Sequence, residues 1–253
     1  MARTIAVSGT ASGLGLAVRQ RLEAAGDRVV GVDLRDAEVI ADLSTPAGRA
    51  EAVEAVLAAS GGALDGLASV AGVGPHLPSD LVVSVNAFGA LALLDGLLPA
   101  LAGRPGAAAV VVSSNSITLD PTVRADLVDA CLGGDEAAAR AIAAGVPGNT
   151  AYASSKLAVA RAMRRRVAPW GEAGVRLNGV APGPFASALL DASRADPTLG
   201  PLVDLVPIPL GRAGSADEVA APIEFLLSEA AAWIHGSLLF VDGGTDALLR
   251  PDL

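Results

Sequence analysis

Short runs rich in valine, isoleucine and alanine alternate along this chain with longer segments rich in alanine and leucine. Helical crossovers between strands produce this alternation, because parallel neighbours in a sheet need long connections. The pattern predicts an α/β fold with a doubly wound, seven-stranded parallel sheet and helices on both faces. The expected strands lie near residues 3–8, 28–33, 38–41, 64–69, 107–113, 174–179 and 237–241. The expected helices lie near 14–25, 46–59, 79–101, 150–171 and 215–228.

The chain is short enough to form one domain, and we expect residues 1–253 to do so, because no repeat or low-complexity linker divides them. Two stretches interrupt the alternation of strands and helices. Residues 118–149 look like an insertion ahead of a helix. Residues 184–212 combine prolines with scattered leucines, so they either pack as helix on the sheet or form a lid over an apolar ligand.

Composition excludes several classes of function. The formal net charge of −9 argues against nucleic acid or an anionic membrane as a partner, since both favour basic proteins. We see no signal peptide and no uninterrupted apolar stretch of membrane-spanning length. The one cysteine, Cys131, cannot form an internal disulfide, which favours the cytoplasm. With only His76 and His235 as histidines, we expect no metal site.

A glycine-rich loop follows the first expected strand and runs directly into a helix. The loop reads Ser8-Gly-Thr-Ala-Ser-Gly-Leu-Gly15. Glycines at these positions let the backbone turn tightly and approach a pyrophosphate, which the amides and dipole of the helix start would bind. The loop in this context therefore predicts a dinucleotide site.

Asp33 ends the second expected strand, where a carboxylate can bind both ribose hydroxyls of a dinucleotide and repel a 2′-phosphate. Ser12, ahead of the second glycine, brings no positive charge to a phosphate. Both residues favour NAD over NADP, whereas the nearby Arg35 points the other way.

The only tyrosine and the only lysine stand four positions apart, as Tyr152-Ala-Ser-Ser-Lys156. Residues i and i+4 share one face of a helix, so the phenol and the ammonium can address the same small volume. A nearby cation favours the phenolate and brings the phenol's pKa toward working pH. The pair therefore predicts acid/base chemistry at an oxygen atom.

In this order along the chain, these motifs resemble the short-chain dehydrogenase/reductase family, which has a Rossmann-type fold. The resemblance runs from the first strand nearly to the carboxyl end, and departs from the family at residues 69–70, where Ser-Val replaces a pair of asparagines. The residues that it implies for cofactor binding are Gly9, Ser12, Gly13, Leu14, Gly15, Asp33, Asp42, Leu43, Ala71, Gly72, Tyr152, Lys156, Pro182, Gly183 and Ser187.

The resemblance also implies how four side chains divide the catalytic work. Tyr152 is the acid/base, and Lys156 lowers its pKa and binds the nicotinamide ribose. Ser114 donates a hydrogen bond to the substrate oxygen, and Asn86 holds a water that links Lys156 to solvent. The activity implied is interconversion of a secondary alcohol and a ketone by hydride transfer with NAD.

A narrower resemblance rests on the long interval between Ser114 and Tyr152, which the 118–149 insertion creates, and on the tail after residue 242. It points to the bacterial subgroup of 3α-hydroxysteroid dehydrogenases/carbonyl reductases. In that subgroup the insertion covers helix faces that other members use to form tetramers, so a homodimer is implied. A hydrophobic cyclic alcohol or ketone, such as a 3α-hydroxysteroid, is the expected substrate.

Two alternatives remain open from the sequence. The substrate could be a non-steroid alcohol or ketone. The chain could also be a catalytically silent NAD(H)-binding regulator, because a fold does not by itself establish an activity. An assay of NADH absorbance with a panel of ketones separates the last case from the other two.

Overall fold

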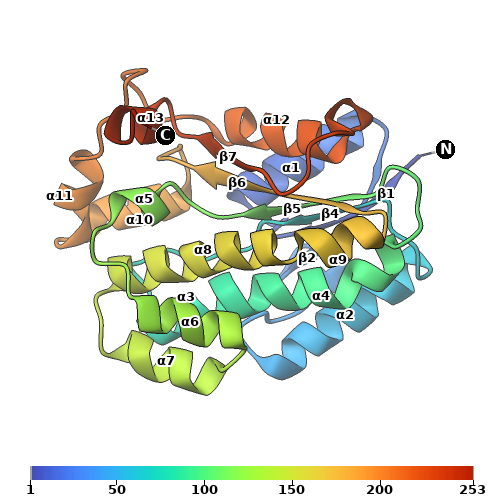
Figure 1. Ribbon diagram of the computed structural model, residues 1–253, viewed down its shortest axis with the longest axis horizontal. Coiled ribbons are helices and arrows are strands. Elements are labelled where there is room, and N and C mark those ends of the chain that lie inside the picture. Colours follow the sequence, from blue (N-terminus) through green and yellow to red (C-terminus); the bar gives the residue numbers. More distant parts are fainter. Residues whose placement is uncertain (1, 253) are drawn as a thin grey trace.

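The computed structural model describes residues 2–252, and its centre is a seven-stranded sheet (Figure 1). Neighbouring strands are all parallel, in the order β3-β2-β1-β4-β5-β6-β7. The chain adds strands on one side of β1 up to β3 and on its other side from β4 to β7, so the strand order reverses between β1 and β4. Sheets of this kind bind ligands at such a point. The predicted doubly wound sheet is confirmed. Its strands are β1 (Thr4–Ser8), β2 (Arg28–Asp33), β3 (Val39–Ile40), β4 (Gly66–Ser69), β5 (Ala108–Val112), β6 (Arg176–Pro182) and β7 (Leu238–Val241).

Two hydrophobic cores lie on opposite faces of the sheet. Successive residues of a strand point to opposite faces, so Ala6 and Leu67 belong to one core while Ile5, Val7 and Ala68 belong to the other. The interiors of the central strands β1 and β5 therefore have consecutive apolar residues rather than alternating ones, as expected for a sheet that is covered on both sides.

Helices cover both faces (Figure 1). One face carries α1 (Gly13–Ala24) and α12 (Ala216–Leu227), which pack against each other. The other face carries α2 (Pro46–Ser60), α4 (Ala90–Leu101) and α8 (Gly148–Arg165), with the short α9 (Val167–Glu172) after α8. Further short helices include α3 (Ser79–Val83), α5 (Ser116–Leu119), α13 (Thr245–Leu249) and the 3₁₀ turn η2 (Glu229–Ala231).

The helix expected over 79–101 contains a π-helical turn, η1 (Ser84–Gly89), between α3 and α4. Together these pieces make a run, Ser79–Leu101, that is long and apolar enough to cross a membrane, contrary to our expectation of no such stretch. Within the fold, however, 61% of the most apolar window of this run is buried. The run is apolar because it faces the sheet and the neighbouring helices, as core helices do.

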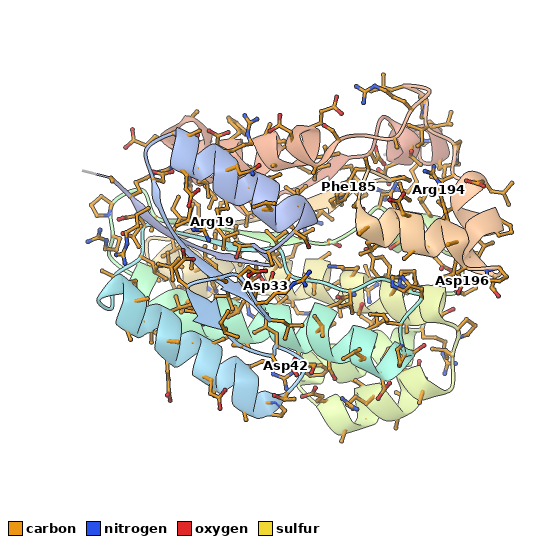
Figure 2. The ribbon with its side chains drawn as sticks, turned by 180° about the vertical axis from the view of Figure 1, so that it is seen from behind. Arg19, Asp33, Asp42, Phe185, Arg194 and Asp196 are labelled. Atoms are coloured by element: carbon orange, nitrogen blue, oxygen red, sulfur yellow. The ribbon has the colours of Figure 1, made fainter. Side chains whose placement is uncertain are left out.

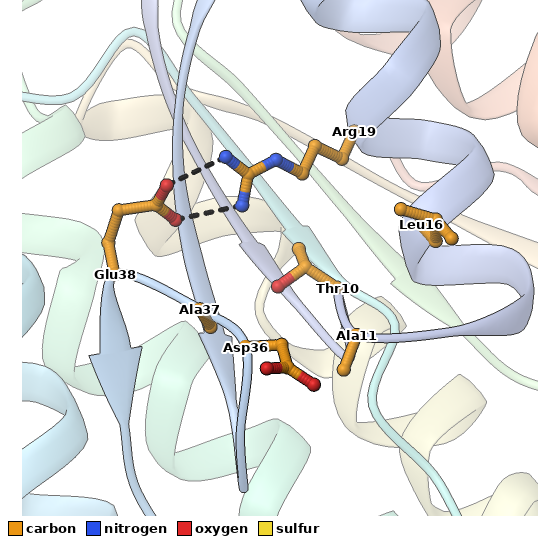
Figure 3. Close-up of a pocket in the computed structure, with 7 residues that line it drawn as sticks. All are labelled: Thr10, Ala11, Leu16, Arg19, Asp36, Ala37 and Glu38. Atoms are coloured by element: carbon orange, nitrogen blue, oxygen red, sulfur yellow. Dashed lines mark hydrogen bonds and ion pairs between the residues drawn. The ribbon is translucent and has the colours of Figure 1, made fainter.

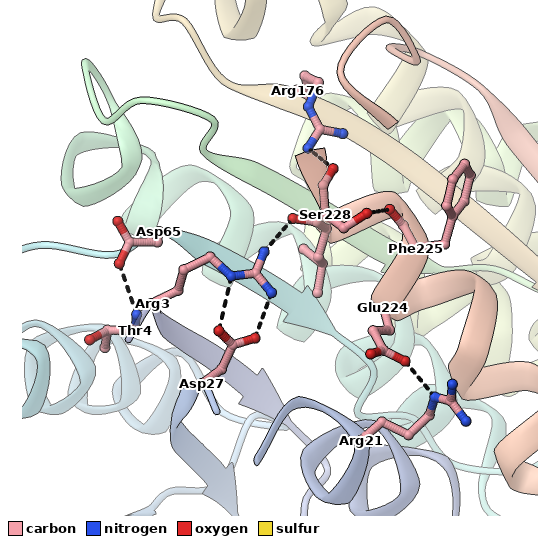
Figure 4. A network of polar contacts seen from close by, with 10 residues as sticks. Arg3, Thr4, Arg21, Asp27, Asp65, Arg176, Glu224, Phe225 and Ser228 are labelled. Atoms are coloured by element: carbon pink, nitrogen blue, oxygen red, sulfur yellow. Dashed lines mark hydrogen bonds and ion pairs between the residues drawn. The ribbon is translucent and has the colours of Figure 1, made fainter. Parts of the chain in front are cut away.

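Arginines bind the carboxyl end of α12 to the sheet (Figure 4). Arg3 donates to the Leu227 carbonyl over 2.7 Å and pairs through two hydrogen bonds with Asp27. Arg176 donates to the carbonyls of Leu226 and Ser228 at 2.7 and 2.9 Å. These donors satisfy carbonyls that a helix end otherwise leaves without partners. The contacts join β1 and β6 to the last long helix.

The predicted insertion is largely helical. It contains α6 (Ala125–Gly133) and α7 (Glu136–Ala144), which pack against α8 and α3 on the outer side of that helical layer (Figure 1). Glu136 pairs with the buried Arg49 of α2. Cys131 lies inside this layer, and burial raises the pKa of its thiol to about 12. The insertion is therefore an extra layer of packed structure.

The expected lid segment forms two helices, α10 (Ala188–Ala195) and α11 (Leu199–Asp204), which pack against each other. Both lie at the end of the molecule where the strands finish (Figure 1). Leu190 and Leu199 are buried, whereas Leu205 is 76% exposed. The segment is therefore helical, with some leucines packed inward and others open to solvent, and its role as a lid stays a prediction.

Candidate active site

A cavity of about 940 Å³ opens at the carboxyl ends of the strands. Its wall runs from the glycine loop to the α10–α11 segment. Figure 2 labels Asp33 and Asp42 on one side and Phe185 on the other. The predicted site residues that line it are Gly9, Ser12, Gly13, Leu14, Gly15, Asp33, Asp42, Leu43, Ala71, Gly72, Ser114, Tyr152, Lys156, Pro182, Gly183 and Ser187. Of the predicted residues, only Asn86 does not reach the wall.

The glycine loop is shaped by close backbone contacts. Gly9 has a φ of 81° and donates from its amide to the Val32 carbonyl over 2.8 Å. A Cβ at Gly15 would lie 2.0 Å from the Gly9 carbonyl oxygen, so only glycine fits there. Ser12 precedes α1 without capping it through its side chain. The first amides of α1 therefore remain available to an anion in the cavity.

Backbone amides hold the two acidic side chains expected to contact the adenosine. The Asp33 carboxylate accepts from the amides of Ala11 and Leu34, over 2.9 and 2.7 Å. The Asp42 carboxylate accepts from the amide of Ser44 at 2.9 Å. Both residues line the same cavity as the glycine loop. The helix start, the open backbone and these placed acids fit an adenine dinucleotide.

The helix α8 and the end of β5 bring the catalytic candidates together. Lys156 is buried, and its Nζ donates to the Val112 carbonyl over 3.0 Å. Ser113 donates to the Lys156 carbonyl at 2.9 Å and so fastens α8 to β5. The Lys156 Nζ lies 5.9 Å from the centre of the Tyr152 ring. Ser114 follows on the same strand end and is also buried.

Burial dominates the electrostatics of this group. It lowers the pKa of Lys156 to about 8. Burial also raises the pKa of the Tyr152 phenol, which the Ser114 hydroxyl lowers in part. The net shift of the Tyr152 pKa is upward, and the lowering that we expect from Lys156 stays a prediction. Loss of water is the larger cause of the shift at Tyr152, and the lysine donates to the Val112 carbonyl.

Asn86 lies wholly buried in the π-helical turn. Its amide forms two hydrogen bonds with the backbone of Val73, accepting over 2.8 Å and donating over 3.0 Å. A Cβ at Gly72 would lie 3.0 Å from Asn86 Oδ1 and 3.2 Å from Lys156 Nζ. Asn86 therefore shapes the loop after β4 beside Lys156. Its part in holding a water remains a prediction.

Sequence reasoning missed several polar residues in the cavity wall, among them Asn115, Asp120 and Asn149. Asn149 donates to Asp120 over 2.9 Å, and both line the cavity. Asn115 also lines it, and among residues 2–252 its buried Nδ2 has no hydrogen-bond partner. Asn149 precedes Tyr152 by three positions, so the helical spacing that links Tyr152 to Lys156 could have revealed it. Nothing in the sequence marked Asp120 or Asn115.

The far end of the cavity is apolar. Leu189, Leu202 and Val206 line it from the α10–α11 segment. Ile208 of the same 184–212 segment does not line the cavity and lies near Gly243. Phe185 lines the cavity and also packs against the core that contains α12.

The position of His235 bears on our prediction of no metal site. His235 accepts from the Leu177 amide over 2.9 Å, and its other nitrogen lies 2.8 Å from the Val167 carbonyl. It therefore connects the strand β6 to the helix α9. Across positions 2–252 we find no group of three or more histidine, cysteine or acidic side chains arranged to hold a metal ion.

Known proteins resemble the chain along its whole length. A family model described as enoyl-(acyl carrier protein) reductase matches residues 136–246. A solved structure described as a short chain dehydrogenase/reductase family protein superposes with a TM-score of 0.71, at 26% identity and 97% coverage of both chains. The 3-alpha-hydroxysteroid dehydrogenase/carbonyl reductase of Comamonas testosteroni is 48% identical over 251 residues, which are 98% of each protein. The chain belongs to the short-chain dehydrogenase/reductase family.

A further member of the family has the same framework almost throughout. The crystal structure of the 3-alpha-hydroxysteroid dehydrogenase from Pseudomonas sp. B-0831, complexed with NADH, superposes with a TM-score of 0.96. It is 49% identical, and the match covers 99% of both chains. The narrower resemblance seen in the sequence is confirmed by these two relatives.

This short-chain dehydrogenase/reductase replaces the expected asparagine pair with a different link between β1 and β4. The Ser8 hydroxyl accepts from the amides of Val70 and Ala71, each over 3.0 Å. It thereby holds the ends of the two strands together at the point where the winding reverses. Ser69, at one of the substituted positions, is buried, and its hydroxyl has no partner within residues 2–252.

Proposed function

We propose that this short-chain dehydrogenase/reductase interconverts a secondary alcohol and a ketone by hydride transfer, with NAD as its cofactor. One observation carries the proposal. A single cavity is lined by the glycine loop and Asp33 and also by Tyr152, Lys156 and Ser114. A dinucleotide that binds along the first set of residues would bring its reactive end to the second set.

Asp33 and the relative complexed with NADH support NAD rather than NADP. When bound, the dinucleotide supplies the centre that gives or takes the hydride. The residues in place to hold it are the helix start at Gly13, the carboxylates of Asp33 and Asp42, and the turn at Pro182-Gly183. Lys156 would bind the nicotinamide ribose.

Tyr152 lines the cavity, and the raised pKa of its phenol suits it to giving a proton to a carbonyl oxygen. Ser114 is a neighbouring donor that can stabilise negative charge on the same oxygen. In the reverse direction Tyr152 acts as the base in its phenolate form, after its own proton has left, and then takes the proton from the alcohol. Lys156, whose pKa lies near 8, can pass that proton onward, and Asn86 would position a water for it.

A hydrophobic cyclic substrate such as a 3α-hydroxysteroid fits the apolar end of the cavity. Leucines and valines of the α10–α11 segment line this end. The two relatives that are 48% and 49% identical over nearly their full length are both described as 3-alpha-hydroxysteroid dehydrogenases. The Asp120–Asn149 pair adds a polar position to the wall. A non-steroid alcohol or ketone is the alternative.

The test compares the parent with Tyr152→Phe, using NADH absorbance and a panel of steroid, terpenoid and acyl ketones. We expect kcat to fall by about 10²-fold or more, which is the usual worth of a general acid, while NADH still binds in calorimetry. Ser155→Ala is a matched control, because this hydroxyl lies on α8 and bonds the Tyr152 carbonyl outside the cavity wall. An unchanged kcat in Tyr152→Phe would rule out the assignment. A parent that binds NADH but reduces no ketone would favour the silent regulator.

We also propose a single domain that acts as a cytoplasmic homodimer and binds neither nucleic acid nor membrane. The acidic charge and the one buried cysteine support the location and the choice of partners. The insertion supports a dimer, because it covers the outer side of α8. Apolar side chains lie exposed on α12, after η2 and on β7, namely Phe225, Trp233 and Leu239, and a second copy would bury them.

A further inference from the structure

A second, smaller pocket of about 550 Å³ lies beside the glycine loop (Figure 3). The Ala11 amide, in its wall, donates to Asp33 over 2.9 Å. The pocket therefore adjoins the carboxylate that we assign to the adenosine ribose. A phosphate on that ribose would lie toward this pocket. Its lining residues are Thr10, Ala11, Leu16, Arg19, Asp36, Ala37 and Glu38.

Arg19 is the only cation among these lining residues, and two acids hold it. Both terminal nitrogens of its guanidinium donate to Glu38, over 3.0 and 2.7 Å (Figure 3). Its Nε donates to Glu23 over 2.8 Å. The two hydrogen bonds to Glu38 occupy the edge of the guanidinium that would otherwise bind a phosphate.

Thr10 adds a second donor that faces the same place. It is 2% exposed, and within residues 2–252 its hydroxyl has no partner. A Cβ at Gly31 would lie 2.6 Å from the Thr10 hydroxyl, 2.8 Å from a Glu38 oxygen and 3.1 Å from an Arg19 nitrogen. The three side chains therefore meet above the backbone of Gly31. The absence of a side chain at Gly31 is what leaves room for them.

Acidic groups surround this meeting point. The Glu38 carboxylate also accepts a hydrogen bond from the Gly31 amide over 2.8 Å, so both Arg19 and the backbone hold it in place. Asp36 lies in the wall with a φ of 51°, in the left-handed region that aspartate tolerates better than most residues. Together with Asp33, these acids make the pocket anionic while Arg19 is neutralised.

We propose that Glu38 is a second determinant of dinucleotide choice, which disfavours NADP by occupying Arg19. Released from Glu38, the Arg19 guanidinium and the Thr10 hydroxyl would together bind a 2′-phosphate. This inference rests on the proposed use of NAD. Asp33 then binds the ribose. Glu38 keeps Arg19 and Thr10 from acting as a phosphate-binding site.

Glu38→Gln tests the inference with little change of shape. The glutamine keeps an acceptor for the Gly31 amide but removes the charge that holds Arg19. Dissociation constants for NADH and NADPH are measured by calorimetry, together with kcat/KM for each cofactor. We expect NADPH to bind about tenfold more tightly, which is about 1.4 kcal/mol, while NADH binding changes by less than about twofold.

Two further variants identify the cause. Glu23→Gln removes a charge from the same Arg19 but leaves both bonds to Glu38, so it is expected to change neither dissociation constant appreciably. Glu38→Gln combined with Arg19→Ala is expected to lose the gain, because the phosphate has lost its cation.

Each outcome has a separate meaning. If the parent binds NADPH as tightly as NADH, the proposed preference for NAD fails, and the inference fails with it. If the parent prefers NADH and Glu38→Gln behaves like Glu23→Gln, only the inference is overturned. A gain that persists without Arg19 also overturns it, because simple removal of negative charge then accounts for the effect.

Discussion

The buried Lys156 is expected to destabilise the folded protein, and the cost should depend on pH. Its pKa falls from 10.5 to about 8 because burial disfavours the ammonium form. One pKa unit is worth about 1.4 kcal/mol, so the lysine costs about 3 kcal/mol near pH 7. The folded state holds this proton less tightly than the unfolded chain. The free energy of unfolding therefore gains a contribution as the pH rises from about 8 toward 10.5.

Lys156→Met removes this cost together with the hydrogen bond to the Val112 carbonyl. Loss of a buried hydrogen bond costs about 1 to 2 kcal/mol. Near pH 7 the variant should therefore be more stable than the parent by about 1 to 2 kcal/mol. Near pH 9.5 the remaining cost of the lysine is about 1.4 kcal/mol, so the two proteins should be about equally stable.

Urea unfolding of both proteins without cofactor, at several pH values between these limits, measures the difference. Arg161→Met is the matched control, because it removes an exposed cation from the same helix. Its difference from the parent should stay constant with pH, since arginine does not titrate in this range. A Lys156→Met difference that is equally flat would refute the reasoning, whatever its sign.

Two other perturbations follow from the cofactor site and the insertion. Asp33→Ala should weaken NADH binding about tenfold or more, because a charged hydrogen-bond acceptor for the ribose is lost. Calorimetry measures the dissociation constants, and an unchanged ratio of NADH to NADPH affinity would contradict the role of Asp33. Replacing the helices at residues 125–144 by a short Gly-Ser linker should expose apolar surface of α8, which now packs against Leu127, Val128 and Cys131. Light scattering should then show an assembly larger than that of the parent. An unchanged mass would argue that the insertion does not cover an apolar surface.

The sheet could be predicted because its signal is local. Buried parallel strands need continuous apolar residues, and each expected strand coincides with an observed one. The strand expected over 174–179 continues to Pro182, where an amide hydrogen is no longer required at the strand end. The π-helical turn at 84–89 has no such signal, because its sequence fits an ordinary helix equally well.

The site was predictable wherever spacing alone determines geometry. Tyr152 and Lys156 share a helix face at any level of burial, so their meeting at the cavity could be anticipated. Their pKa values could not be, because these depend on how much water the folded chain removes and on the Val112 carbonyl that the lysine binds. The Asp120–Asn149 pair depends on how the insertion folds back, which no short motif encodes.

The arginine contacts at the end of α12 also bear on the order of events during synthesis. Arg3, near the beginning of the chain, donates to Leu227, and Arg21 of α1 pairs with Asp217 and Glu224 of α12. The face of the sheet that carries the glycine loop therefore lacks its covering partner until most of the chain has left the ribosome. Contacts of such long range slow folding, because a large loop must close before they form. The nucleotide loop is among the first segments to be made, yet its supporting face is completed only with one of the last helices.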